Sequence, residues 1–165
     1  PVWENKNMKN RFNSSVLHQG YIYGFDEAIF ACIDARTGER KWKGGRYGYG
    51  QVLLVPAGAG SASSGSVSRG PTSGAASASS EGAMSSASAP SASPAPSAGV
   101  SGPANLIVIT ESGDLVLLKA TPAAHEELAR FSAIEGKTWN QHAIADGILL
   151  VRNTREMAAF DLRQR

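Results

Sequence analysis

The stretch Gly20-YIYGFDEAIFACI-Asp34 decides the fold, because its pattern recurs twice further along the chain. Asn105-LIVITESGDLVLL-Lys119 and Gly147-ILLVRNTREMAAF-Asp161 have the same length, and each joins two apolar runs through a polar break. Two runs of strand-forming residues around such a break predict a β-hairpin. A recurring hairpin of this kind cannot bury its apolar face alone, so the pattern predicts hairpins that stack on one another.

The repeat extends beyond the hairpin on both sides. Phe12-NSSVLHQ-Gly20 matches Trp139-NQHAIAD-Gly147 in register, which adds a strand before the hairpin. Asp34-ARTGERK-Trp42 and His125-EELAR-Phe131 each predict a further strand that follows the hairpin and ends on an aromatic residue. Trp3 occupies the same position and is left over from a preceding unit. Each unit therefore contains four strands.

The spacing of these aromatic residues gives the period of the repeat. Trp3 and Trp42 are 39 residues apart, and Trp42 and Phe131 are 41 apart once the 48-residue segment 56–103 is set aside. Four strands in a period of about 40 residues are typical of a β-propeller blade. No window has a sustained helical period, which argues against a helical solenoid. The sequence predicts an all-β partial propeller of about two and a half to three four-stranded antiparallel blades.

Composition divides the chain into three parts. Residues 56–103 are almost entirely Gly, Ser, Ala and Pro, which predicts a disordered insertion into one loop of a blade. Residues 1–55 would hold the end of one blade, a full blade and the first strand of the next. Residues 104–165 would hold the rest of that blade and most of a further one. Because the chain begins at Pro1 rather than Met, we interpret it as a piece of a longer protein.

Charge and residue types exclude few functions. The formal net charge of +2 is too small to predict binding to nucleic acid, and the apolar runs are too short for a membrane span. Cys32 is the only cysteine, which excludes an internal disulfide and a zinc site made of several cysteines. We expect Cys32 to be a small buried residue. The three histidines form no metal-binding pattern, and we expect ordinary surface or strand positions for them. Gly44-GRYGY-Gly50 lacks the third glycine and the following helix of a nucleotide loop, so a turn is expected.

One unit carries a family resemblance. Cys32-Ile33-Asp34-Ala-Arg-Thr37-Gly38-Glu-Arg-Lys-Trp42 resembles the repeat of pyrroloquinoline quinone (PQQ) type propellers, and the chain outside the insertion resembles the C-terminal blades of bacterial quinoprotein-like proteins. The motif has a structural explanation. Asp34 and Thr37 can hydrogen-bond the backbone of a turn that Gly38 allows with positive φ, and Trp42 can then pack over the adjacent blade.

The resemblance implies two classes of function. Some members are dehydrogenases of alcohols or sugars that hold the quinone and calcium with a Cys-Cys pair, a carboxylate base and acidic or amide ligands; others are non-catalytic scaffolds. The chain has no Cys-Cys pair and no acidic cluster, so we assign no catalytic or metal-binding residue and leave cofactor-binding residues unknown. We favour a binding or protein-interaction scaffold. The alternatives are a PQQ-dependent dehydrogenase with its site mainly in other blades, and a purely structural spacer. The resemblance also suggests a periplasmic or other extracytoplasmic location.

The expected blade geometry points to one face as a binding surface. Connections between consecutive blades leave the same end of the propeller, and they carry aromatic, amide and cationic residues that suit a protein or small polar ligand. These residues are Lys6, Lys9, Asn10, Arg11, Arg46, Tyr47, Tyr49, Lys137, Trp139, Asn140 and His142. The alternative is that Phe12 and Trp139 are buried at the blade entry. The remaining blades of the parent chain are the other expected partner.

Overall fold

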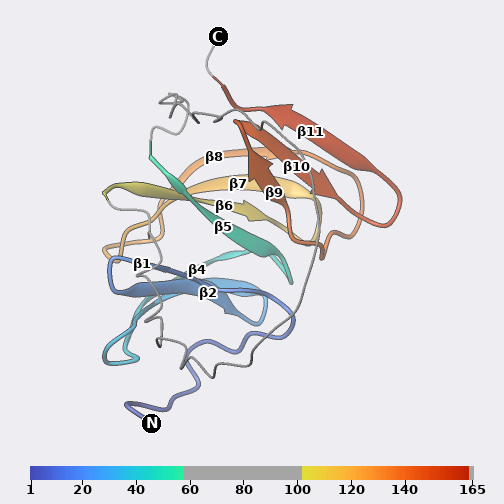
Figure 1. Ribbon diagram of the computed structural model, residues 1–165. Helices are drawn as coiled ribbons and strands as arrows, with labels where there is room; N and C mark the ends of the chain where they lie inside the picture. The colour runs from blue at the N-terminus through green and yellow to red at the C-terminus, as the bar shows by residue number, and fades with distance from the viewer. Residues whose placement is uncertain (58–101, 164–165) are drawn as a thin grey trace, which may run out of the picture. The chain divides into compact units, whose positions relative to one another are not determined.

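The computed structural model describes residues 1–57 and 102–163, and all of these belong to one compact unit. All regular secondary structure in the described residues is β-strand, and the strands form three antiparallel sheets (Figure 1). The first sheet contains β1 (Val16–His18), β2 (Tyr21–Asp26), β3 (Ile29–Asp34) and β4 (Arg40–Arg46). The second contains β5 (Gln51–Pro56), β6 (Ala104–Ile109), β7 (Asp114–Lys119) and β8 (Glu127–Ser132). The third contains β9 (Ala143–Ala145), β10 (Ile148–Arg152) and β11 (Met157–Asp161).

Strands lie side by side in each sheet in the order in which they occur in the sequence. The three recurring hairpins are β2–β3, β6–β7 and β10–β11, and each is antiparallel without a register shift. Among the described residues, the predictions of all-β structure and of three hairpins are confirmed, and four-stranded antiparallel units are confirmed for the first two sheets. The third sheet has three strands among the described residues.

Alternation of side chains places a core between the first and second sheets. Tyr23, Phe25, Phe30 and Cys32 extend from β2 and β3, and they pack against valines and leucines of the second sheet. The aromatic residues are fully buried, and each buried side chain of this size contributes about 1.5–3 kcal/mol. Cys32 is a free thiol with no exposed surface, so its expected role as a small core residue is confirmed.

The second sheet is covered on both faces. Leu106 and Val108 of β6 face the first sheet, whereas Ile107 and Ile109 face the third sheet, where they meet Leu149. Two buried faces explain why β6 is a continuous apolar run rather than an alternating one. Strands β10 and β11 alternate between buried or half-buried and exposed positions, because only one face of the third sheet is covered by described residues.

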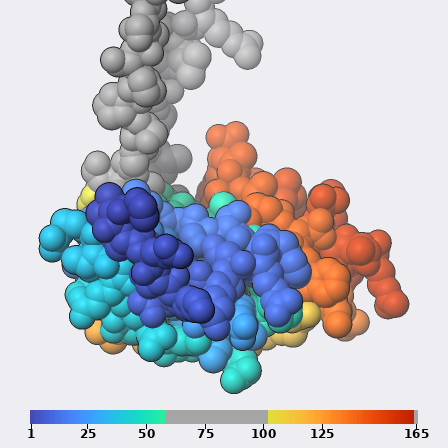
Figure 2. Space-filling view, turned by 90° about the horizontal axis from the view of Figure 1, so that it is seen from below, coloured from blue at the N-terminus to red at the C-terminus, as the bar shows by residue number. Residues whose placement is uncertain are grey.

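Indole side chains connect successive units in the same way. The N-terminal segment lies over the first sheet (Figure 2), and Trp3 Nε1 donates to the carbonyl of Ala35, just after β3, at 2.9 Å. Trp42 Nε1 of β4 donates at 2.9 Å to the carbonyl of Thr121, just after β7. Trp42 also lies against His125, with ring centroids 5.5 Å apart. The expectation that Trp42 packs on the next unit is confirmed.

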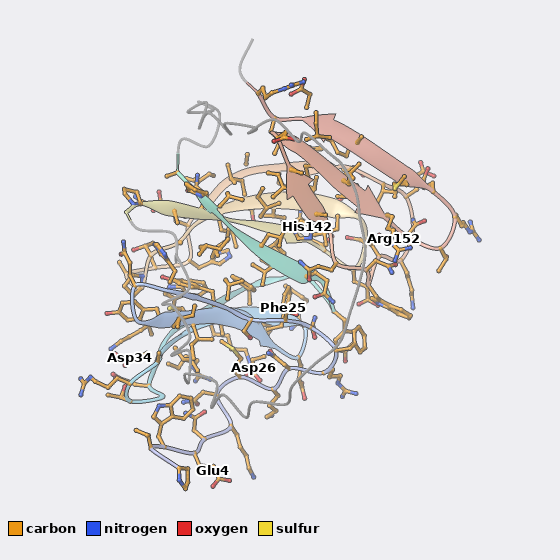
Figure 3. The ribbon with its side chains drawn as sticks, in the orientation of Figure 1. Glu4, Phe25, Asp26, Asp34, His142 and Arg152 are labelled. Atoms are coloured by element: carbon orange, nitrogen blue, oxygen red, sulfur yellow. The ribbon has the colours of Figure 1, made fainter. Side chains whose placement is uncertain are left out.

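The Asp34 turn has the structure that its sequence predicts (Figure 3). Asp34 Oδ1 accepts hydrogen bonds from the backbone N–H groups of Thr37 and Arg36, which hold the pKa of this carboxyl below its usual value. Gly38 has φ +73°, and a Cβ there would collide with the side chains of Asn5 and Trp3. Glycine is required both by the backbone conformation and by the close approach of the N-terminal segment.

The predicted insertion starts at a hairpin. Val55 pairs with Asn105 and Pro56 with Ala104, and the N–H of Ala57 donates to the carbonyl of Pro103. Strands β5 and β6 are therefore direct neighbours, as removal of the low-complexity segment suggested. Residues 58–101 of that segment lie outside the described residues.

Candidate binding face

Three connections meet where β1, β5 and β9 begin, and each contributes one aromatic side chain. Phe12 precedes β1, Tyr49 lies between β4 and β5, and Trp139 lies between β8 and β9. The Phe12 ring centroid is 5.6 Å from that of Tyr49 and 5.8 Å from that of Trp139. Phe12 is 55% exposed and Trp139 48% exposed. The alternative that these two residues are buried plugs is therefore wrong, and their exposed rings form a cluster with the half-buried ring of Tyr49.

Gln51 fixes the backbone on which this cluster stands. Its amide is buried, and Nε2 donates to the carbonyls of Phe12 at 3.3 Å and Trp139 at 3.1 Å. Gln51 Oε1 accepts the N–H of Ser14. A buried amide is tolerated only when its donors and acceptors are paired, so these bonds fix the two connections against the start of β5. Sequence reasoning missed Gln51; the only signal was a polar residue at the start of an apolar run.

Glu111, in the turn between β6 and β7, is the second link. Its Oε1 accepts the indole N–H of Trp139 at 3.1 Å, and its Oε2 accepts the backbone N–H of Tyr49 at 3.3 Å. The backbone N–H of Glu111 donates to Tyr47, and its carbonyl accepts from Thr138. One acidic residue therefore orients the Trp139 ring and holds the backbone of Tyr49. Its position in a polar hairpin break gave no sign of this role.

Cationic side chains surround the rings. The Arg11 guanidinium lies 5.5 Å from the centroid of Tyr49, and the Lys137 ammonium lies 5.5 Å from that of Trp139, both at cation–π distance. Arg46 is exposed in the same region. None of the three forms an ion pair with a residue that the structure describes. We call Arg11, Phe12, Arg46, Tyr49, Lys137 and Trp139 the aromatic–cationic face.

Two grooves lie at this face. One, of about 450 Å³, is lined by Arg46, Tyr47, Gly48, Glu111, Ser112, Gly136 and Lys137. The other, of about 540 Å³, is lined by Phe12, Ser14, Val16, Gln51, Val52, Leu53, Trp139, Asn140 and Gln141. Both include residues of the connection between β8 and β9. The face therefore has a shallow, open groove on either side of that connection.

Two residues predicted as exposed members of this face are buried instead. Tyr47 is 2% exposed, and its hydroxyl lies 2.8 Å from His125 Nε2 and donates to Glu127 Oε2 at 3.0 Å. Burial, followed by the hydrogen bond to Glu127 and the charge of that carboxylate, raises the pKa of Tyr47. The reason is the chain reversal after β4, where Tyr47 N–H bonds the Ala28 carbonyl and directs the ring into the first core.

His142 is also buried, 2% exposed, rather than at a surface position (Figure 3). Its Nε2 lies 3.0 Å from the carbonyl of Ile107 in β6, and burial lowers its pKa to about 4. The neutral ring therefore donates to that carbonyl. Residues three apart in this connection point to opposite sides, so Trp139 is exposed where His142 is buried.

The other predicted residues divide between structural and surface positions. Asn10 Nδ2 donates to Ser15 Oγ at 2.6 Å, and the Lys9 N–H donates to Asp26 Oδ1, so both hold the N-terminal segment in place. Asp26 is ion-paired with Lys43; burial alone raises its pKa, but the bonds from Lys43 and Lys9 outweigh this and the pKa is lowered. Lys6 is exposed, and Asn140 lines the larger groove.

No protein-family model and no curated protein matches this chain. Assignment of a function therefore rests on the residues themselves.

The described residues do not fit a quinone and calcium site. No group of three His, Cys, Asp or Glu side chains within residues 1–57 and 102–163 could hold a metal ion. Cys32 lies in the core, where burial raises its thiol pKa to about 11. Asp26, Asp114 and Asp161 are each paired with a lysine or arginine. In the same part of the chain there is no helix long and apolar enough to cross a membrane.

Proposed function

We propose that this chain is part of a β-propeller of four-stranded repeats and that its aromatic–cationic face is a non-catalytic binding surface of an interaction scaffold. The propeller is supported by the sequential strand order and by the recurring indole contact, in which Trp3 and Trp42 each bind the turn after the third strand of the next sheet. Sheets that stack through one repeated contact are what a propeller requires.

The observation that carries the binding function is the cluster that the exposed rings of Phe12 and Trp139 form with the half-buried ring of Tyr49. Contiguous exposed apolar patches mark interaction sites, and aromatic residues together with arginine dominate the energetics of protein interfaces. Here the rings come from three separate connections, and hydrogen bonds from Gln51 and to Glu111 hold these connections in place. A partner would meet a preorganised surface, which lowers the entropic cost of binding.

Partner capture by the intact protein tests the proposal. Phe12→Ala/Trp139→Ala should remove captured partners, whereas Leu128→Ala, which truncates an exposed apolar residue of β8 outside the face, should retain them. Equal melting temperatures of the three proteins would establish that folding is intact. Retention of every partner by the double variant would contradict the proposal.

A titration of the same protein with pyrroloquinoline quinone and calcium tests its non-catalytic part. We expect no saturable absorbance change and no dye-coupled oxidation of alcohols or sugars. Saturable uptake with turnover would overturn this part and favour a dehydrogenase whose site lies in other blades.

A further inference from the structure

The two grooves of the aromatic–cationic face differ in chemistry although they share one connection. Arg46 and Lys137 line the smaller groove, together with the hydroxyl of Ser112. Glu111 is the only carboxylate among the lining residues; its oxygens accept the neutral N–H groups of Trp139 and Tyr49, so its charge remains and the lining of two cations and one carboxylate is positive on balance. Two cations without an ion-pair partner among the described residues favour an anionic group in this groove.

The larger groove is suited to an apolar group. Val16 of β1 and Leu53 of β5 line it together with Phe12 and Trp139, and Val52 is buried at this groove. The polar residues Ser14, Gln51, Asn140 and Gln141 complete the lining. Aliphatic residues with aromatic residues at the rim resemble the pockets that receive an anchor side chain in protein interfaces. Lys137 lines the smaller groove, and its ammonium lies 5.5 Å from the ring centroid of Trp139, which lines the larger one. The two grooves are therefore adjacent.

The backbone edge of β5 at this groove is already occupied. Asn13 Nδ2 donates to the carbonyl of Gly50 at 2.6 Å, and Gln141 Nε2 donates to the carbonyl of Val52 at 3.2 Å. A ligand that added a strand here would have to displace both amides. Recognition through side chains is therefore favoured over strand addition.

We propose that the aromatic–cationic face binds an acidic peptide segment in which a carboxylate neighbours an apolar side chain. The carboxylate lies between Arg46 and Lys137, and the apolar side chain enters the groove beside Phe12 and Trp139. This inference rests on the proposed binding function and adds the chemistry of the partner to it. Charge complementarity sets the choice of partner and the rate of encounter, and the apolar anchor supplies most of the affinity.

The ring geometry favours a peptide over a sugar or a nucleic acid base. The ring of Phe12 is inclined by 46° to that of Tyr49 and by 64° to that of Trp139, so the cluster offers no flat platform. Cations already lie near the rings of Tyr49 and Trp139. Stacked bases require open ring faces, whereas the aliphatic part of the larger groove, at Val16 and Leu53, is better filled by an aliphatic or aromatic side chain.

Selection of short random peptides displayed on phage, with the intact protein as bait, tests the inference. We expect enriched sequences with Asp or Glu beside a large apolar residue, and binding of the synthetic peptides, measured by fluorescence anisotropy, that weakens with salt. Arg46→Ala/Lys137→Ala should weaken binding by about tenfold or more and reduce its salt dependence. Arg36→Ala removes an exposed cation in the Asp34 turn and should leave the affinity unchanged.

The outcomes separate this inference from the proposed function. Enrichment of peptides without acidic residues that still require Phe12 and Trp139 would overturn the acidic partner and leave the binding face standing. The same holds if anisotropy shows tight binding of an acidic polysaccharide or single-stranded DNA that depends on these two residues. Peptides that bind equally to wild type, to Arg46→Ala/Lys137→Ala and to Phe12→Ala/Trp139→Ala would overturn both. All these substitutions are at exposed positions, and an unchanged melting temperature confirms folding.

Discussion

Lowering the pH should destabilise the fold through His142. The ring is 2% exposed, and burial lowers its pKa from the usual value near 6.5 to about 4. The unfolded chain therefore binds a proton more readily than the folded one, so stability increases with pH in this range. The contribution is fully present above about pH 6.5 and is lost progressively as the pH falls toward about 4. A difference of roughly 2.5 pKa units corresponds to about 3 kcal/mol.

Urea unfolding as a function of pH measures this effect. His142→Gln keeps a donor for the Ile107 carbonyl but has no ionisable ring. We expect the unfolding free energy of the wild type to fall by about 3 kcal/mol more than that of the variant between pH 7 and pH 4. The lowered carboxyl pKa values of Asp34 and Asp161 act in a more acidic range and are common to both proteins. Parallel curves for the two proteins would refute the buried, neutral state of His142.

Three further predictions concern the contact between the first two sheets, the support of the aromatic–cationic face, and the uncovered face of the third sheet. Trp42→Ala should lower the unfolding free energy by about 2–3 kcal/mol in chemical denaturation, because it removes a half-buried ring and the hydrogen bond to the second sheet; a loss well below 1 kcal/mol would contradict the stacking contact. Gln51→Ala should cost about 2–4 kcal/mol and broaden the signal of the nearby indole in nitrogen–proton NMR spectra, whereas a sharp, unshifted signal would show that the amide does not position the rings. The isolated chain should self-associate in light scattering through the uncovered face of the third sheet, and Leu150→Lys/Met157→Lys should reduce this; a monomeric wild type would refute it.

Local sequence patterns predicted the strands because each hairpin is encoded within about 15 consecutive residues. The Asp34 turn was predictable for the same reason, since the hydrogen bonds that Asp34 accepts from Arg36, Thr37 and Gly38 join residues two to four apart. The position of Trp42 followed from the period of the repeat.

The details of the face were not predictable from local patterns. Gln51 bonds residues 39 and 88 positions away, and Glu111 bonds residues 28 and 62 positions away. Tyr47 and His142 share connections with exposed residues, yet the direction of the backbone at each position turns them into the core. Repeat alignment places a residue in a connection but does not determine on which side of it the side chain lies.

Hydrogen–deuterium exchange of the intact protein with and without a selected acidic peptide tests the central claim most directly. We expect protection in residues 11–14, 46–51 and 136–141, the three connections that carry the aromatic–cationic face. Exchange in residues 34–38, which form the Asp34 turn, should be unchanged. Protection confined to that turn or to the third sheet, with no change in the three connections, would contradict the account.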